Sequence, residues 1–143
     1  MPQQGLSVGR DTTLVFQTTT GRLSVPNLTG FRKKQDATIE RVKLISGITK
    51  TLRFFDGWSG SFNVNRAGPE LDIYFAQTEA DYYAGLDEQG CQIYETITEP
   101  GGILTQWRYD DVMLEYADAG EAAGDASVKS MVNFTASRRT RIA

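Results

Sequence analysis

Apolar residues alternate with polar ones along most of this chain, which is the pattern of β-strands that bury one face. Turn residues such as Gly47 and those at 100–102 lie between successive runs and predict hairpins. The central run is the clearest, because Trp58, Phe62 and Val64 share one parity. We predict strands over residues 13–17, 22–25, 37–46, 49–55, 58–66, 92–98, 103–109, 112–116 and 128–136.

The hydrophobic period changes from two to about 3.6 after Gly68, which predicts a helix. Pro69 suits a first helical position, and the acids Glu70 and Asp72 suit a first turn. Gly85 ends the pattern. An apolar and aromatic stripe follows the helical spacing, and such stripes pack on a sheet far more often than they bind a ligand. Its members are Leu71, Tyr74, Phe75, Thr78 and Tyr82.

One domain of the α+β class accounts for this order of elements. The chain has 143 residues, of which 40% are hydrophobic and 23% charged, as is ordinary for a single folded domain. We predict a mainly β structure, an antiparallel β-sandwich or barrel-like domain with one helix packed on its flank. Three aperiodic segments lie outside these elements: a long basic loop over 26–37, an acidic loop over 117–126 and a basic tail over 137–143.

Charges of opposite sign occupy different parts of the chain, although the net charge is only −3. Residues 1–66 carry a net charge of +6, residues 67–127 a net −13, and residues 128–143 a net +4. If folding keeps these signs apart, an acidic surface and basic elements attract copies of the subunit head to tail. The alternative is that folding scatters the charges evenly.

Most catalytic chemistry lacks its residues here. The chain has no histidine, and its single cysteine, Cys91, allows neither an intrachain disulfide nor a zinc site. We interpret Cys91 as a small residue near the start of a strand. No phosphate-binding glycine motif or calcium-loop spacing occurs. We therefore predict a protein that is not an enzyme and has no cofactor or metal.

Five carboxylates are the only group of residues in this sequence that suits acid–base catalysis without histidine. They lie on predicted hairpins and are equally at home on a solvated sheet face. These residues are Glu95, Glu99, Asp110, Asp111 and Glu115.

The chain shows no signs of a membrane or nucleic-acid protein. No run approaches the roughly 20 apolar residues of a membrane helix, and the start lacks the pattern of a secretory signal. We expect a protein made in the cytoplasm. The sequence pI is about 5.0, so contacts with another subunit explain the basic clusters at 32–34 and 138–141 at least as well as nucleic-acid binding does.

The order of elements, together with two short segments, resembles the tail tube proteins of contractile-tailed bacteriophages. The segments are the strand Gly57-Trp58-Ser59-Gly60-Ser61-Phe62 and the ending Val132-Asn133-Phe134-Thr135-Ala136-Ser137-Arg138-Arg139. That family is similar in fold to the tube proteins of secretion systems and of tailocins, the contractile bacteriocins. The likeness covers most of the chain, and a secretion-system or tailocin tube stays open as an alternative.

The resemblance implies a structural role in a virion tail that is assembled in the host cytoplasm. Six subunits would join their sheets into one β-barrel ring, and the rings would stack head to tail into a hollow conduit for genome delivery. It also implies contacts with a tail sheath, a tape measure protein and baseplate or terminator proteins, and transient, non-specific passage of DNA.

Within such a tube, the basic loop and tail are the expected subunit contacts, through Arg32, Lys33, Lys34, Arg138, Arg139 and Arg141. DNA must slide rather than bind, since each phosphate neutralised by a lysine or arginine releases counterions and adds affinity. We therefore predict a lumen that is acidic or neutral, lined by some of Glu95, Glu99, Asp110, Asp111 and Glu115.

A rival hypothesis from another class is a carbohydrate-binding or hydrolytic β-sandwich. The carboxylates would supply its chemistry, and Trp58 and Trp107 would supply flat apolar platforms for a sugar. Exposed tryptophan rings would favour this rival, and buried rings would count against it.

Overall fold

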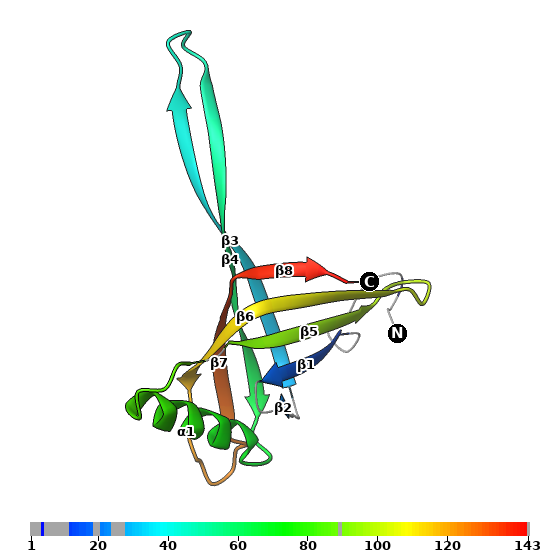
Figure 1. Cartoon of the computed structure of the whole chain (residues 1–143). Coiled ribbons are helices and arrows are strands. Elements are labelled where there is room, and N and C mark those ends of the chain that lie inside the picture. Colours follow the sequence, from blue (N-terminus) through cyan, green and yellow to red (C-terminus); the bar gives the residue numbers. More distant parts are fainter. Residues whose placement is uncertain (1–3, 5–11, 19–20, 24–27, 89, 143) are drawn as a thin grey trace.

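The strands of this protein pair antiparallel in one eight-stranded sheet, in the order β2-β1-β5-β6-β7-β4-β3, with β8 paired to β6. The computed structural model describes residues 4, 12–18, 21–23, 28–88 and 90–142 (Figure 1). Within them the mainly β fold with one helix is confirmed. The elements are β1 (Thr12–Thr18), β2 (Gly21–Leu23), β3 (Leu28–Lys43), β4 (Thr49–Asn65), α1 (Glu70–Tyr83), β5 (Cys91–Thr98), β6 (Leu104–Asp118), β7 (Lys129–Ala136) and β8 (Arg138–Arg141).

Strand β6 divides the sheet into two halves, because its two ends have different neighbours. It pairs with β8 up to Asp110 and with β5 up to Val112, and from Met113 onward it pairs with β7. Asp111 lies between these parts with a φ of 52°, and the inward-facing parity changes there, since Tyr109 and Val112 are both buried. The predicted strands 103–109 and 112–116 are therefore one bent strand. The change of parity that separates them in the sequence marks a bend rather than a turn.

The hydrophobic core fills the space between the two halves of the sheet. Phe16 and Ile93 come from β1 and β5, whereas Phe62, Val132 and Phe134 come from β4 and β7. The ring centroids of Phe16 and Phe62 lie 5.0 Å apart, which joins the halves directly. Burying each such side chain contributes about 1.5–3 kcal/mol. The sheet is packed on itself and is not closed into a barrel.

Helix α1 lies across one end of the folded sheet (Figure 1). Leu71 is buried, and the ring of Phe75 lies 4.1 Å from that of Tyr116 on β6, as expected for a helix that packs on a sheet. Pro69 is the N-cap residue rather than the first helical residue. Tyr82 is exposed, so the prediction that the apolar stripe extends to it is wrong.

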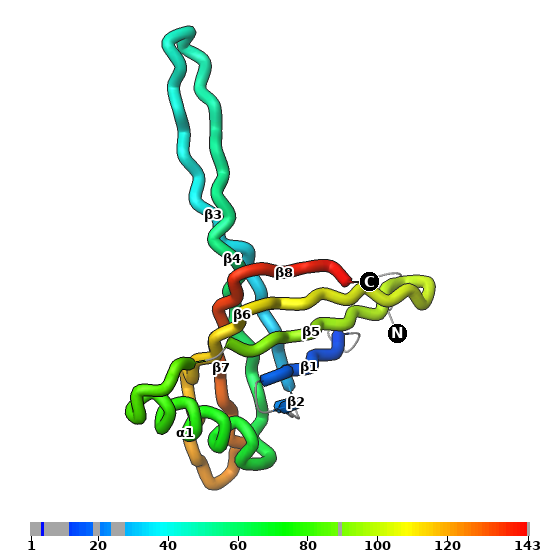
Figure 2. The backbone as a smooth tube through the Cα atoms, viewed as in Figure 1, coloured from blue at the N-terminus to red at the C-terminus, as the bar shows by residue number. Residues whose placement is uncertain are grey.

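Strands β3 and β4 form the longest hairpin, and its outer half leaves the body of the protein. Before Trp58, β4 pairs only with β3 among the described strands. Residues 37–55 therefore project from the body as a two-stranded hairpin, which we call the arm (Figures 1 and 2). Gly57 lies at its base with a φ of 108°, and a Cβ at this position would collide with the carbonyl oxygen of Ala136.

Two segments predicted to lack regular structure are strands. Residues 28–37 of the predicted basic loop belong to β3, and residues 138–141 of the predicted basic tail form β8. Positions 26 and 27 lie outside the described residues. In both strands a charged residue, Lys33 or Arg139, takes an inward-facing position where alternation would place an apolar one. Of the predicted acidic loop 117–126, the first two residues belong to β6, which continues to Asp118, and residues 119–126 lie between β6 and β7.

Candidate assembly surfaces

The half of the sheet formed by β1, β5, β6 and β8 has unpaired strand edges on both sides. Among the described strands, β8 pairs only with β6, and the β1 residues from Thr12 to Val15 pair only with β5. Unpaired edges expose backbone donors and acceptors that can pair with another chain. Because the two edges belong to opposite sides of the same sheet, one copy can add to the next without limit until a ring closes.

The outward face of this half is covered by neutral polar side chains. Along β5, Cys91, Ile93 and Glu95 point into the core, so Gln92, Tyr94 and Thr96 lie on the opposite face. The face is tied together by side-chain contacts. These are Gln92 Nε2 to Asp110 Oδ1 at 3.3 Å, Tyr94 Oη to Gln92 Oε1 at 3.0 Å, Gln106 Nε2 to Thr96 Oγ1 at 3.4 Å, and Arg108 Nε to Asp110 Oδ1 at 2.9 Å.

A buried carboxylate on the inward face anchors two of the predicted interface cations. Glu95 is 1% exposed, and its oxygens lie 2.5 Å from Lys33 Nζ and 3.9 Å from the Arg139 guanidinium. The Tyr109 hydroxyl donates to Glu95 Oε1 at 3.0 Å. Burial, and then the charge of Glu95, raise the pKa of the Tyr109 phenol above its ordinary value. A buried charge needs such compensation, so this cluster joins β3, β5, β6 and β8.

The Arg139 guanidinium also packs over the rings of Trp58 and Trp107, the two residues that the carbohydrate-binding hypothesis requires. It lies 3.6 Å from the ring centroid of Trp107 and 4.5 Å from that of Trp58. Both rings are only partly exposed and pack against the core. Neither tryptophan offers an open platform to a sugar, which counts against a carbohydrate-binding β-sandwich.

The six predicted interface cations divide into two groups. Lys33 and Arg139 are held by Glu95 inside the subunit, so the prediction that they contact a neighbouring subunit loses its support. Arg32 and Lys34 are exposed on β3, beside the base of the arm. Arg138 and Arg141 are exposed on β8, at the edge of the sheet.

The five predicted acids do not form one site. Glu95 is buried, so the prediction that it faces a lumen is wrong. Glu99 lies in the turn after β5, Asp111 is exposed at the bend of β6, and Glu115 is exposed on the other half of the sheet, opposite Asn133. Of the five, Asp110 alone lies on the neutral outward face described above, where it is paired with Arg108.

The arm is a second surface, and the sequence analysis did not assign it a role. Its exposed apolar side chains lie on both of its faces and at its tip. They are Ile39, Leu44, Ile45, Ile48, Leu52, Phe54 and Phe55. An isolated two-stranded hairpin is only marginally stable in water, and clustered exposed apolar residues mark contact sites. The available signal was that apolar residues in 37–55 occur on both parities, so neither face is reserved for a core.

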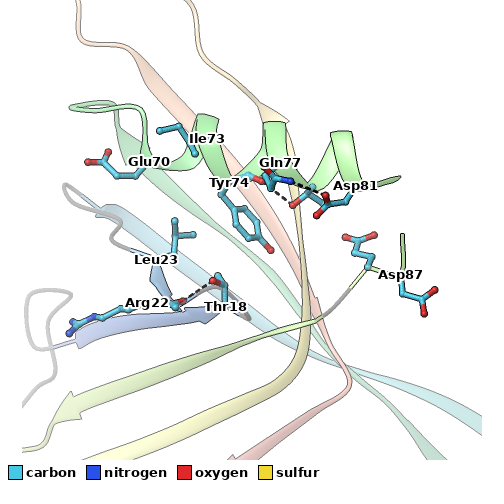
Figure 3. Close-up of a pocket in the computed structure, with 12 residues that line it drawn as sticks. Thr18, Arg22, Leu23, Glu70, Ile73, Tyr74, Gln77, Asp81 and Asp87 are labelled. Atoms are coloured by element: carbon cyan, nitrogen blue, oxygen red, sulfur yellow. Dashed lines mark hydrogen bonds between the residues drawn. The ribbon is translucent and has the colours of Figure 1, made fainter. Parts of the chain in front are cut away.

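A cleft of about 280 Å³ lies between α1 and the β1–β2 hairpin (Figure 3). Leu23, Ile73 and Tyr74 supply apolar surface, and Tyr74 points from the helix toward the hairpin. Burial is the main cause that raises the pKa of Tyr74 to about 12. Among the residues that the structure describes, the charged ones that line the cleft are four acids and one base: Glu70, Asp81, Asp87, Glu88 and Arg22.

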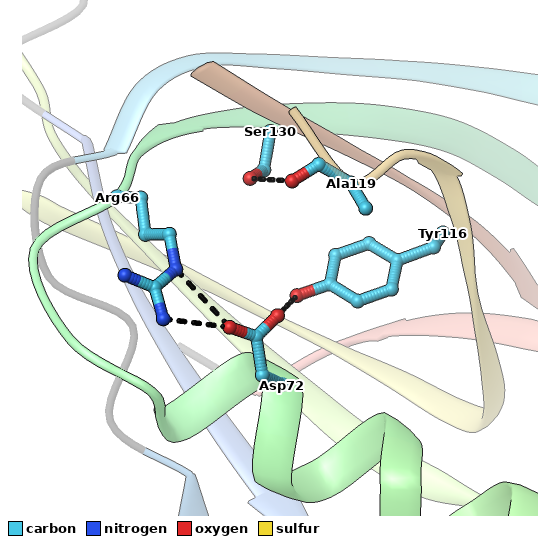
Figure 4. A network of polar contacts seen from close by, with 5 residues as sticks. All are labelled: Arg66, Asp72, Tyr116, Ala119 and Ser130. Carbon is cyan, nitrogen blue, oxygen red and sulfur yellow. Dashed lines mark hydrogen bonds and ion pairs between the residues drawn. The ribbon is translucent and has the colours of Figure 1, made fainter. Parts of the chain in front are cut away.

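A polar network fixes the start of α1 to the body (Figure 4). Asp72 accepts a hydrogen bond from the Tyr116 hydroxyl at 2.7 Å and pairs with the Arg66 guanidinium at 2.9 Å. These two contacts, the tyrosine first, hold the pKa of Asp72 below its ordinary value. Burial, and then the hydrogen bond to Asp72, raise the pKa of Tyr116 to about 12. Nearby, Ser130 donates to the carbonyl oxygen of Ala119 at 3.1 Å.

No protein-family model and no curated protein matches this sequence. Solved structures do share its fold. A chain in the structure of the anti-feeding prophage baseplate matches 98% of this chain and 97% of its own length, with a TM-score of 0.60 and 9% sequence identity. A chain of the PVC sheath/tube terminator, from an extracellular contractile injection system, covers 91% and 93%, with a TM-score of 0.58 and 11% identity. A chain of the native gene transfer agent virion covers 95% and 98%, with a TM-score of 0.54 and 14% identity.

The chain has the fold of contractile injection system and phage-like particle components. The resemblance to tail tube proteins therefore holds at the level of the fold. Within the described ranges, no group of three or more cysteine or carboxylate side chains is placed to hold a metal ion. In the part of the chain that the structure describes, no helix is long and apolar enough to cross a membrane.

Proposed function

We propose that this protein is the subunit of a tail tube, in which copies join edge to edge into rings and the rings stack into a hollow conduit. The observation that carries the proposal is the half-sheet β1-β5-β6-β8, which has a packed core on one face and, among the described strands, an unpaired edge at β8 and at the Thr12–Val15 part of β1. Pairing β8 of one copy with β1 of the next removes both exposed edges. Six copies per ring is the number that the resemblance implies, and the matched baseplate structure is itself six-fold symmetrised.

The outward face of this half-sheet is the wall of the conduit. Its glutamine, threonine and tyrosine side chains bond to one another, and its Arg108 charge is paired with Asp110. Such a wall offers a passing DNA chain few unpaired cations, so it gains little affinity from counterion release. The lumen is thus mostly neutral and polar rather than acidic, with Arg138 on β8 as an exposed cation opposite Asp110, and the DNA slides because few groups on the wall compete for its phosphates.

Several contacts of the assembled tail follow from this proposal. Arg32, Lys34 and Arg138 are exposed and remain the cations for contacts between subunits. A sheath, a tape measure protein and baseplate or terminator proteins are the outer and terminal partners, and the role is structural rather than enzymatic. A tube from a secretion system or a tailocin has the same architecture, and genes for capsid proteins beside this one would distinguish the phage case.

A second candidate is a ring at the end of a tube rather than a repeated tube ring. It is favoured by the matched structures, which include a baseplate, a tube-terminating cap and a terminator. A terminal ring has one stacking face that continues the tube and one that ends it, so the purified protein would form single or double rings and no long polymer.

Electron microscopy of the purified protein tests both candidates. We expect hollow tubes of stacked rings, formed by the protein alone or on an initiating ring. Rings that never lengthen would favour the terminal candidate. Only monomers, across salt and protein concentrations and with tail partners present, would contradict a role in ring formation.

A further inference from the structure

The tip of the arm combines apolar and basic side chains. Ile45 is fully exposed, and Leu44 and Ile48 beside it are also exposed. Lys43 and Lys50 flank this apolar loop where the two strands meet it. Over residues 37–55 the formal charge is +3, since Glu40 opposes Arg41, Lys43, Lys50 and Arg53. An exposed apolar tip flanked by lysines is complementary to a partner surface that has an apolar centre and an acidic rim.

The cleft between α1 and the β1–β2 hairpin has that character. Its charged lining residues sum to a formal charge of −3, and its apolar part is formed by Leu23, Ile73 and Tyr74. A cavity of about 150 Å³ already accommodates a benzene molecule, so 280 Å³ suits one or two branched aliphatic side chains. The acidic lining disfavours a nucleic acid in this place.

The arm tip lies at the opposite end of the molecule from α1 and β2 (Figures 1 and 2), the two elements that border the cleft. Complementary surfaces at opposite ends make a head-to-tail contact, which repeats from copy to copy and produces an open stack rather than a closed dimer. The contact therefore acts along the stacking direction. Edge pairing of β1 and β8 acts around the ring, so the two contacts are separate.

We propose that the arm tip of one copy docks into the α1 cleft of a second copy in the adjacent ring. Ile45 enters the apolar part, while Lys43 and Lys50 meet the acids at the rim, among them Asp81, Asp87 and Glu88. This inference rests on the proposed function in one respect, namely that copies stack. It goes further because it names the surface that receives the arm. The contact is partly electrostatic, so added salt weakens it.

Cysteine cross-linking tests the contact directly. The Ser46→Cys change places a thiol at the tip, and Gln77→Cys places one in the cleft; the native Cys91 is buried. Under mild oxidation we expect the double variant to give a ladder of disulfide-linked oligomers, and each single variant to give at most dimers. The matched control is Ser46→Cys with Glu79→Cys, because Glu79 is exposed on α1 but does not line the cleft. The control should give no ladder.

A charge exchange supports the same assignment without new thiols. Changing Lys43 and Lys50 to Glu should raise the concentration needed for assembly about tenfold, and changing Asp81 and Glu88 to Lys should do the same. The combined variant should recover most of the loss, because the pairs are restored with reversed sign. Additive losses in the combined variant would contradict the pairing.

Micrographs and cross-links together separate this contact from the proposed function. Tubes without a ladder would overturn the docking of arm and cleft and leave the tube function standing. A ladder without rings or tubes would retain the docking and overturn the tube function. Neither rings nor a ladder would overturn both.

Discussion

The two ends of the β3–β4 hairpin have the same secondary structure and opposite surroundings. At its base, Phe62 is completely buried and Phe31 stacks on Phe134 with ring centroids 5.5 Å apart. In the arm, Phe54 and Phe55 are 53% and 60% exposed, and Arg53 covers the ring of Phe55 from 4.7 Å. Apolar residues at the base serve the fold of one subunit, whereas those of the arm stay largely exposed in it. The difference separates the residues that stabilise one subunit from the residues that are available for contacts between subunits.

One pair of substitutions compares the base of the hairpin with the arm, and it has the largest expected effect. Phe62→Ala should lower the free energy of unfolding of the monomer by about 3–5 kcal/mol, because it leaves a cavity in the core. Phe54→Ala should change it by no more than about 0.5 kcal/mol, as expected for an exposed site, yet impair assembly. Urea unfolding of dilute protein measures the first quantity, and sedimentation measures the second. Equal losses of monomer stability would contradict the division between base and arm.

The buried charge cluster gives the next effect. Glu95→Gln removes the charge that compensates Lys33 and Arg139, and it should lower the free energy of unfolding by about 3 kcal/mol. Because Lys33 is partly exposed, about 3 kcal/mol is the largest loss that we expect. Glu99→Gln is the matched control, because Glu99 lies in a turn and should change stability by less than about 0.5 kcal/mol. A silent Glu95→Gln variant would show that the cluster does not hold the body together.

A pair of glycines compares the base of the arm with its tip. Gly57 and Gly47 both have positive φ, but a Cβ would collide with the Ala136 carbonyl at the former and meets nothing within 4 Å at the latter. Gly47→Ala should therefore cost only the backbone strain, about 1 kcal/mol, and Gly57→Ala about 2–3 kcal/mol. Thermal or urea unfolding of the two variants measures the difference, and equal costs would contradict the close packing at Gly57.

The smallest effect concerns Asp72 and pH. Its folded-state pKa is lowered, so the ionised carboxylate stabilises the folded protein above its unfolded pKa of about 3.9. This contribution is lost as the pH falls through the folded-state pKa. The stability difference between wild type and Asp72→Asn should be less than about 1 kcal/mol at neutral pH, because the pair is half-exposed, and should shrink below pH 4. A difference that stays constant to pH 2 would show that ionisation of Asp72 is not involved.

The sequence predicted the fold where inward positions were apolar and failed where they were charged. The strands around Phe62 and Phe134 and the helix from Glu70 followed from periodicity. Lys33 and Arg139 concealed β8 and the part of β3 before residue 37, because inward positions there are filled by cations whose partner, Glu95, is 62 residues from one and 44 from the other in the sequence. Such long-range pairing leaves no local pattern.

The candidate surfaces were less accessible to sequence reasoning than the fold. The cleft takes its four acids from the acidic segment 67–127, but the sequence analysis expected acids of that segment in a lumen and did not predict a cleft. It did not show that Glu95 is buried or that Asp110 is paired with Arg108, since both depend on strand register. The arm was predicted as a hairpin, but its projection follows from the absence of a second neighbour for β4, which only the topology reveals.

Backbone amide hydrogen exchange, compared between dilute monomer and assembled protein, tests the division between base and arm most directly. Exchange reports the free energy of local opening. We predict that amides at the base of the hairpin, around Phe62, are protected in both states, and that amides of residues 37–55 become protected only on assembly. An arm that is equally protected in the monomer, or that stays unprotected in the assembled protein, would contradict the account.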